Sequence, residues 1–177
     1  MVMKTKVIDN FLAEEDFYNL KKLIVYNPEF PFYISDSVAF PKNNEKSSTE
    51  IRYWDSYIAH MIYENDIPHS DFYEMFSNIF IKKFREMEIF KSLLRIKINY
   101  YPATEEVKEH YPHVDHDFQC YGAVYSLNTC DGFTRLSDGT KIESIQNRIV
   151  FFDASKPHNS STTSNSKGRY NINFNFI

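Results

Sequence analysis

Three histidines and two aspartates fall within ten residues of this sequence, in EHYPHVDHDF at positions 109–118. Side chains alternate along an extended chain, so His113 and Asp115 are predicted to share one side while His116 points to the other. His110 lies in a segment whose backbone direction the pattern does not fix, because a proline follows closely. An imidazole and a carboxylate on one side can bind one metal ion. The alternative for this stretch alone is a solvated polar loop.

A further histidine and an arginine follow later in the chain. His158 comes after the apolar segment RIVFFDA and Ser-Lys-Pro, and Arg169 comes eleven residues later, across the polar stretch 159–168, which is predicted to be a hairpin turn. Taken singly, His158 is explained by a strand end and Arg169 by a surface ion pair. With the pair described above they supply two histidines and one carboxylate, the facial ligand set of non-haem Fe(II), beside a group that binds carboxylates. The nearby Asp117 is expected to hold one ligand imidazole by accepting its hydrogen bond.

The elements that position these residues differ between the two halves of the chain. Helical periodicity predicts helices over about 14–25, 49–63 and 72–87, and phenylalanines recur every four residues in the last of them. From Leu94 onward the hydrophobic period shifts to two, and Asp-Gly and Lys-Gly pairs separate the apolar segments as turns do. This second pattern predicts strands over 95–101, 120–127, 133–137, 140–144, 148–154 and 169–177.

These elements predict an α+β, mainly β fold: a double-stranded β-helix, or jelly roll, with N-terminal helices packed on one sheet. We expect one domain over 1–177, in which 1–93 are mostly helical support and 94–177 form the core that carries the site. In RYNINFNF (169–176) polar and apolar residues alternate, so one face is predicted to pack on the helices and the other to line a polar interior. An arginine in such an interior needs a compensating anion.

Composition narrows the class of protein further. The chain has 177 residues, 42% hydrophobic and 17% aromatic, which is ample material for one core. A net charge of −4 with scattered lysines gives no reason to expect a nucleic-acid partner. No apolar run is long enough for a membrane span or a signal peptide, and Cys120 and Cys130 are the only cysteines. We therefore expect a cytoplasmic protein with reduced thiols.

The segments from 94 to 177, taken in order, resemble the 2-oxoglutarate- and Fe(II)-dependent dioxygenase superfamily, in particular its prolyl 4-hydroxylase-like branch. HVD (113–115) resembles the metal-binding pair, and NRIVFFDASKPH (147–158) resembles the strand that delivers the second histidine. KGRYNINFNF (167–176) is similar to the strand that carries the basic anchor of the co-substrate. The remaining matches are NYYP (99–102), VYSLN (124–128) and DGFTRL (131–136).

The resemblance implies a site and a reaction. The implied Fe(II) ligands are His113, Asp115 and His158, and Arg169 is the implied partner of the distal carboxylate of 2-oxoglutarate. Tyr101 is expected to line the co-substrate pocket, and Asn171, on the same strand face as Arg169, is a further pocket residue. The implied reaction hydroxylates a substrate C–H bond with O₂ and releases succinate and CO₂. Peptidyl proline is the favoured substrate, and a small molecule comes second.

Two departures from the branch concern the co-substrate pocket. Asp131, Gly132 and Phe133 stand where Gly-Gly often precedes the hairpin threonine, and Ser126 stands where some relatives have a tyrosine. Two other functions are weighed against the oxygenase. One is a jelly-roll binding or structural module that keeps the metal and has lost turnover. The other is a zinc hydrolase, which the lack of a second histidine pair disfavours.

Overall fold

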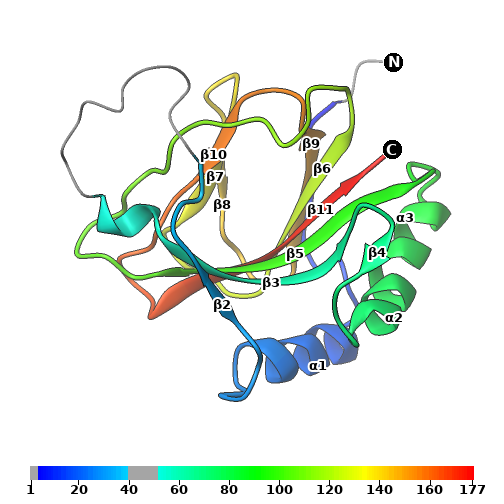
Figure 1. The fold of residues 1–177 in the computed structure, drawn as a ribbon, viewed down its shortest axis with the longest axis horizontal. Coiled ribbons are helices and arrows are strands. Elements are labelled where there is room, and N and C mark those ends of the chain that lie inside the picture. The colour runs from blue at the N-terminus through cyan, green and yellow to red at the C-terminus, as the bar shows by residue number, and fades with distance from the viewer. Residues whose placement is uncertain (1–3, 40–51) are drawn as a thin grey trace.

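The computed structural model describes residues 4–39 and 52–177, and its strands form two antiparallel sheets (Figure 1). The large sheet has the order β1-β9-β6-β11-β5-β3-β2, with β4 paired to β3, and the small sheet has the order β10-β7-β8. The large sheet consists of β1 Lys6–Ile8, β9 Arg148–Asp153, β6 Tyr121–Ser126, β11 Gly168–Phe176, β5 Leu93–Pro102, β3 Tyr57–Glu64, β2 Tyr33–Ser35 and β4 Ile67–Pro68. The small sheet consists of β10 His158–Ser160, β7 Phe133–Leu136 and β8 Lys141–Glu143. All six strands predicted from the period of two are present.

The helices cover one face of the large sheet, while the small sheet lies on its other side (Figure 1). Helix α1 spans Glu14–Ile24, and α2 Tyr73–Phe76 continues through a π-helical turn, Ser77–Ile81, into α3 Lys82–Glu86. The predictions of helices over 14–25 and 72–87 are thus confirmed. None of the helices in the described ranges is long and apolar enough to cross a membrane.

The π-helical turn follows from the spacing of the phenylalanines. Phe76, Phe80 and Phe84 recur every four residues, whereas an α-helix has 3.6 residues per turn, so their stripe would rotate away from the sheet. A π-turn closes its hydrogen bonds over more residues and is therefore wider. All three rings are fully buried, and Phe80 and Phe84 lie 4.7 and 5.3 Å from the ring of Phe174 on β11, between ring centroids.

Strand β11 separates an apolar layer from a polar one. Ile172, Phe174 and Phe176 belong to the core under the helices, whereas Arg169, Asn171, Asn173 and Asn175 occupy the alternate positions. These four polar side chains are also buried, at 9% exposure or less, because they face the small sheet. The predicted polar interior is therefore confirmed, and it contains the candidate site.

The prediction of a helix over 49–63 is wrong. Residues 49–51 lie outside the described part; residues 53–55 form one 3₁₀ turn, and β3 follows at Tyr57–Glu64. Asn65 and Asp66 both have positive φ, at 52° and 63°, which forms the tight hairpin turn that leads into β4. The segment 1–93 thus contributes four strands to the large sheet, and its description as mostly helical support is corrected accordingly.

The prediction that 159–168 is a simple polar turn is also wrong. Strand β10 pairs with β7, so His158 lies opposite Leu136, whereas Arg169 lies opposite Tyr101 in the other sheet. Residues 159–163 are buried although they are polar, because they hydrogen-bond one another and neighbouring loops. His158 and Arg169 therefore face a common interior from two sheets rather than from one hairpin. Cys120 and Cys130 are free and buried.

Candidate metal centre

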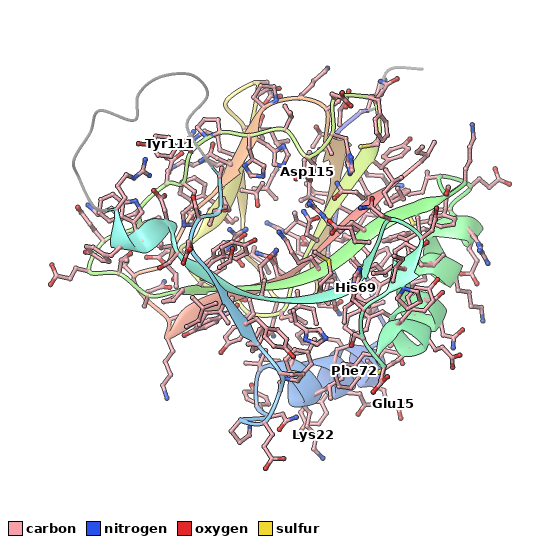
Figure 2. The ribbon with its side chains drawn as sticks, viewed as in Figure 1. Glu15, Lys22, His69, Phe72, Tyr111 and Asp115 are labelled. Carbon is pink, nitrogen blue, oxygen red and sulfur yellow. The ribbon has the colours of Figure 1, made fainter. Side chains whose placement is uncertain are left out.

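His113, Asp115 and His158 come together between the two sheets. One ligand atom from each lies within 4.8 Å of the others, and no other such group of three occurs in the described residues. The Nε2 atoms of His113 and His158 are 3.5 and 3.7 Å from the two carboxylate oxygens of Asp115. Figure 2 shows Asp115 across the large sheet from Phe72 and Lys22, which lie on the helical side.

Backbone hydrogen bonds hold the three residues in place. His113 and His158 exchange N–H···O bonds of 2.9 Å in both directions, and the Asp115 N–H donates to Ala154 O at 3.0 Å. Ala154 directly follows β9, so the loop that bears the first two residues is fixed to the chain that delivers the third. Their spacing therefore depends on the sheet rather than on a flexible loop.

The outer nitrogens of the two imidazoles face backbone carbonyls. His158 Nδ1–H donates to Lys156 O at 3.0 Å, and His113 Nδ1 lies 3.5 Å from Tyr111 O. This arrangement leaves Nε2 of each ring directed to the centre of the cluster. The prediction that Asp117 accepts from a ligand imidazole is wrong, since its side chain is exposed and these carbonyls occupy that place.

Asp115 is a buried carboxylate held in its charged form. Its side chain is 4% exposed, with Arg95 Nη2 at 3.0 Å from one oxygen and Asn175 Nδ2 donating to the other at 2.8 Å. Burial raises its pKa, but the hydrogen bond from His113 and the charge of Arg95 outweigh that effect and hold the pKa well below its usual range. Burial lowers the pKa of His158, which favours the neutral imidazole. Both shifts favour the protonation states that bind metals.

Arg169 is a buried cation without an acidic partner. Its side chain is 1% exposed, and in the described part of the chain no carboxylate forms an ion pair with it. Nη2 donates to Thr134 Oγ1 at 2.8 Å and Nη1 to Ser161 O at 3.4 Å, while Nε has no hydrogen-bond partner. Burying an unpaired charge is costly, so this guanidinium is suited to an anionic ligand.

Gly132 allows the close approach that places Arg169. A Cβ atom at this position would lie 2.6 Å from Thr162 O and 2.8 Å from Arg169 Cδ. Asp131 accepts hydrogen bonds from Thr163 and Ser164, which fixes the neighbouring loop. Gly132 is thus the glycine of this segment that the position of Arg169 requires.

A cavity extends from the triad along the large sheet. It is lined by two valines and by polar, aromatic and charged side chains, namely Val38, Val124, Tyr57, Arg95, Lys97, Asn99, Tyr101, His113, Asp115, Thr134, His158, Asn159, Ser160, Asn171 and Asn173. Tyr101 and Asn171 thus line the same cavity as the triad, and Arg169 reaches its wall through the hydrogen bond to Thr134. That this cavity takes the co-substrate stays a prediction.

The sequence matches no protein-family model and no curated protein. Solved structures do match: a prolyl 4-hydroxylase from Pseudomonas putida has a TM-score of 0.64 at 14% identity, covering 97% of this chain and 91% of that one. The chain has the fold of the prolyl 4-hydroxylases. A prolyl hydroxylase from Trichoplax adhaerens, solved with a peptide fragment of hypoxia inducible factor, gives 0.64 at 16% identity over 97% and 83%. A viral collagen prolyl hydroxylase from Paramecium bursaria Chlorella virus-1 gives 0.63 at 13% over 99% and 97%.

Within this fold, the other two clustered histidines lie outside the triad. His110 is 2% exposed; its Nε2–H donates to Trp54 O at 3.0 Å, and Nδ1 accepts from the Ser160 hydroxyl at 2.8 Å. Burial lowers the pKa of His110 to about 4. Its ring packs against Tyr101 with centroids 5.1 Å apart, so it supports the cavity wall. His116 packs on Phe118 instead.

Sequence reasoning did not identify Arg95, Lys97, Thr134 and Asn175 as part of this site. A signal for the first two was available: in RIKINYY they share the strand face of Tyr101, so alternation places them in the same interior. Asn175 shares the face of Asn171 in the same way. Thr134 carries no such signal, since the pairing of β7 with β10 across the interior decides its place.

Proposed function

We propose that this chain is an Fe(II)- and 2-oxoglutarate-dependent dioxygenase that hydroxylates a substrate C–H bond with O₂ and releases succinate and CO₂. One observation carries the proposal: a cluster of two histidines and one carboxylate shares an interior with a buried arginine that has no acidic partner among the described residues. We take the two facing sheets as the double-stranded β-helix that holds such sites. The fold likeness supports this assignment.

The donor set fits ferrous iron. His113, Asp115 and His158 would bind one face of the ion through two imidazoles and one carboxylate, the combination typical of non-haem Fe(II) oxygenases. Bound there, the metal supplies the activation of O₂. The protein's part is to keep Asp115 ionised and oriented, which Arg95 and Asn175 do at 3.0 and 2.8 Å. The positive charge of Arg95 also draws electron density from this ligand.

The buried arginine fits a dicarboxylate co-substrate. Arg169 would pair with its distal carboxylate, and Thr134, which accepts from the guanidinium, would keep the fork in position. Burial raises the pKa of Tyr101, so its hydroxyl stays protonated and can donate to the same ligand. Asn171, held by a 3.0 Å hydrogen bond from Asn99, completes this side of the pocket.

The substrate part of the proposal is a peptidyl proline or a small molecule that reaches the cavity. Several solved structures of the same fold are prolyl hydroxylases, and one of them was solved with a peptide fragment. That likeness concerns the fold, so a synthetic proline-rich peptide and a pool of small metabolites should be tested side by side for stimulation of succinate release.

The decisive experiment measures iron content, 2-oxoglutarate consumption and succinate formation in the purified protein. His158→Ala should lose iron and turnover, because two ligands do not chelate as three do. His116→Ala, next to the site, and His69→Ala, an exposed residue directly after β4 (Figure 2), should keep both. A wild-type protein that binds iron and 2-oxoglutarate but never forms succinate would instead be the inactive binding module.

A further inference from the structure

Two cations of strand β5 line the cavity: Arg95, which contacts Asp115 of the triad, and Lys97. Arg95, Lys97, Asn99 and Tyr101 alternate with core residues and all line the cavity. Arg95 is engaged with Asp115, whereas Lys97 Nζ donates to the hydroxyl of Tyr57 at 3.1 Å. Successive residues on one strand face lie about 7 Å apart, so the ammonium is within the length of a small molecule from the metal ligands.

Lys97 has no acidic partner among residues 4–39 and 52–177. A phenol oxygen satisfies one of the three N–H groups of an ammonium, and it carries no formal charge that would compensate the cation. Burial raises the pKa of Tyr57, but the charge and hydrogen bond of Lys97, the hydrogen bond with Ser35 and the charge of Arg95 together lower it. A lysine held in this way is positioned for a negatively charged ligand.

The charges of the proposed iron and co-substrate do not remove the need for an anion. Arg95, Lys97 and Arg169 face one described carboxylate in this interior, that of Asp115. The two positive charges of Fe(II) and the two negative charges of 2-oxoglutarate offset each other. The excess of positive charge next to the place for the substrate is therefore the same before and after loading, and it is suited to an anionic substrate.

We infer that the substrate carries a carboxylate that pairs with Lys97, so that Lys97 determines substrate specificity. This inference rests on the proposed function and specifies its substrate class. The amide groups of Asn99, Asn171 and Asn173 line the same wall, and the amide oxygen of Asn99 has no hydrogen-bond partner. A wholly apolar substrate would cover this oxygen and the ammonium, whose one hydrogen bond leaves its charge uncompensated. The carboxylate belongs either to a small acid or to an acidic side chain of a peptide.

The test compares acids with their neutral amides in calorimetric titrations of anaerobic protein loaded with Fe(II) and 2-oxoglutarate. The probes are 2-methylpropanoate and L-proline against their amides, and the peptide acetyl-Ala-Glu-Ala-amide against its glutamine counterpart. Wild type should bind at least one acid about tenfold to a hundredfold more tightly than the matching amide, as charge-assisted hydrogen bonds do. A preference among the small probes only, or the peptide only, identifies the source of the carboxylate.

The variants decide whether Lys97 is responsible. Lys97→Met and Lys97→Gln should lose the preference, and Lys97→Arg should restore it. Lys22→Met, which removes an exposed charge from the far side of the molecule (Figure 2), should leave it unchanged. Equal binding of acid and amide by wild type, no binding of any probe, or a preference that persists in Lys97→Met and Lys97→Gln would each overturn the inference.

A failure of the proposed function can be distinguished from a failure of this inference. Iron and 2-oxoglutarate binding are measured first in the same preparations, and their absence counts against the oxygenase. The comparison of acids with amides is then made on the metal-free protein, where Lys97 and the cavity are still present. A Lys97-dependent preference there would keep the anion site and reject the oxygenase.

Discussion

Replacing Arg169 by methionine should affect stability and ligand binding in opposite directions. Methionine keeps an unbranched chain in the same space but removes a cation that is 1% exposed and has no acidic partner in the described structure. An uncompensated buried charge costs several kcal/mol even after relaxation. Its removal also gives up the 2.8 Å bond to Thr134, a contribution of about 1.5 kcal/mol. We expect the ligand-free variant to be at least as stable as wild type.

With 2-oxoglutarate present the order should reverse. Two charge-assisted hydrogen bonds of about 1.5 kcal/mol each correspond to roughly a hundredfold in Kd. At a concentration of 100 times the wild-type Kd, binding stabilises wild type by about 2.7 kcal/mol and such a variant by about 0.4 kcal/mol. Iron affinity should change little, because the guanidinium addresses the co-substrate rather than the metal ligands.

Urea denaturation of wild type and Arg169→Met, with and without 2-oxoglutarate, measures this reversal in the order of stability. Arg135→Met is the matched control, since Arg135 lies on the small sheet and pairs with Glu109 at 2.7 Å near the surface. That control should show the full stabilisation by 2-oxoglutarate. If Arg169→Met is stabilised by 2-oxoglutarate as strongly as wild type, the guanidinium does not bind the co-substrate and the pocket must be reassigned.

Two further predictions concern the surroundings of this pocket. Gly132→Ala should weaken 2-oxoglutarate binding about tenfold or more with iron content unchanged, because the new Cβ would meet Arg169 Cδ at 2.8 Å. Calorimetry measures the binding. The control is Gly139→Ala, where φ is positive but space is open, so that it shows the effect of backbone strain without the contact to Arg169. For His110 the pKa falls from 6.5 to about 4 on burial, so its contribution to stability is complete above pH 6.5 and is lost as the pH falls toward 4. The loss is on the order of 3 kcal/mol, and the urea midpoint of His110→Asn should depend less on pH over that interval than the wild-type midpoint.

The clustering of His113, Asp115 and His158 was predictable from the sequence because its determinants are local. His113 and Asp115 are separated by one residue, and His158 ends a strand whose apolar run is unmistakable. Helix α1 and the helix over 72–87 were predictable for the same reason, since their apolar stripes lie within one element. Segment 49–63 was not, because the spacing of Trp54, Ile58 and Met61 matches a helical stripe, whereas the strand that forms buries Tyr57, Ile62 and Tyr63 instead.

The partners of this cluster could not be predicted because β-sheet register decides them. Asp115 meets Arg95, 20 residues earlier, and Asn175, 60 residues later, through the pairing of β11 with β5. A shift of this register by one residue would turn the side chains of the shifted strand to the helical side, and either Asn175 or Arg95 would leave Asp115. Residues 159–163 were predicted to form a polar turn because of their composition. Polar side chains that hydrogen-bond one another can be buried like apolar ones, so composition did not indicate their burial.

The charged side chains along β5 and β11 depend both on the local sequence pattern and on the pairing of the strands. Alternation alone places Arg95, Lys97 and Arg169 on the inner face of the large sheet, which is an unusual number of cations for one interior. Arg95 neutralises the carboxylate of Asp115, and Arg169 is suited to the proposed co-substrate. The third, Lys97, has no assignment in the proposed catalytic machinery, yet retaining an ammonium next to Tyr57 costs desolvation energy. A carboxylate on the substrate is the remaining charge that would compensate it, which is why the acid and amide titrations address the least explained feature of the interior.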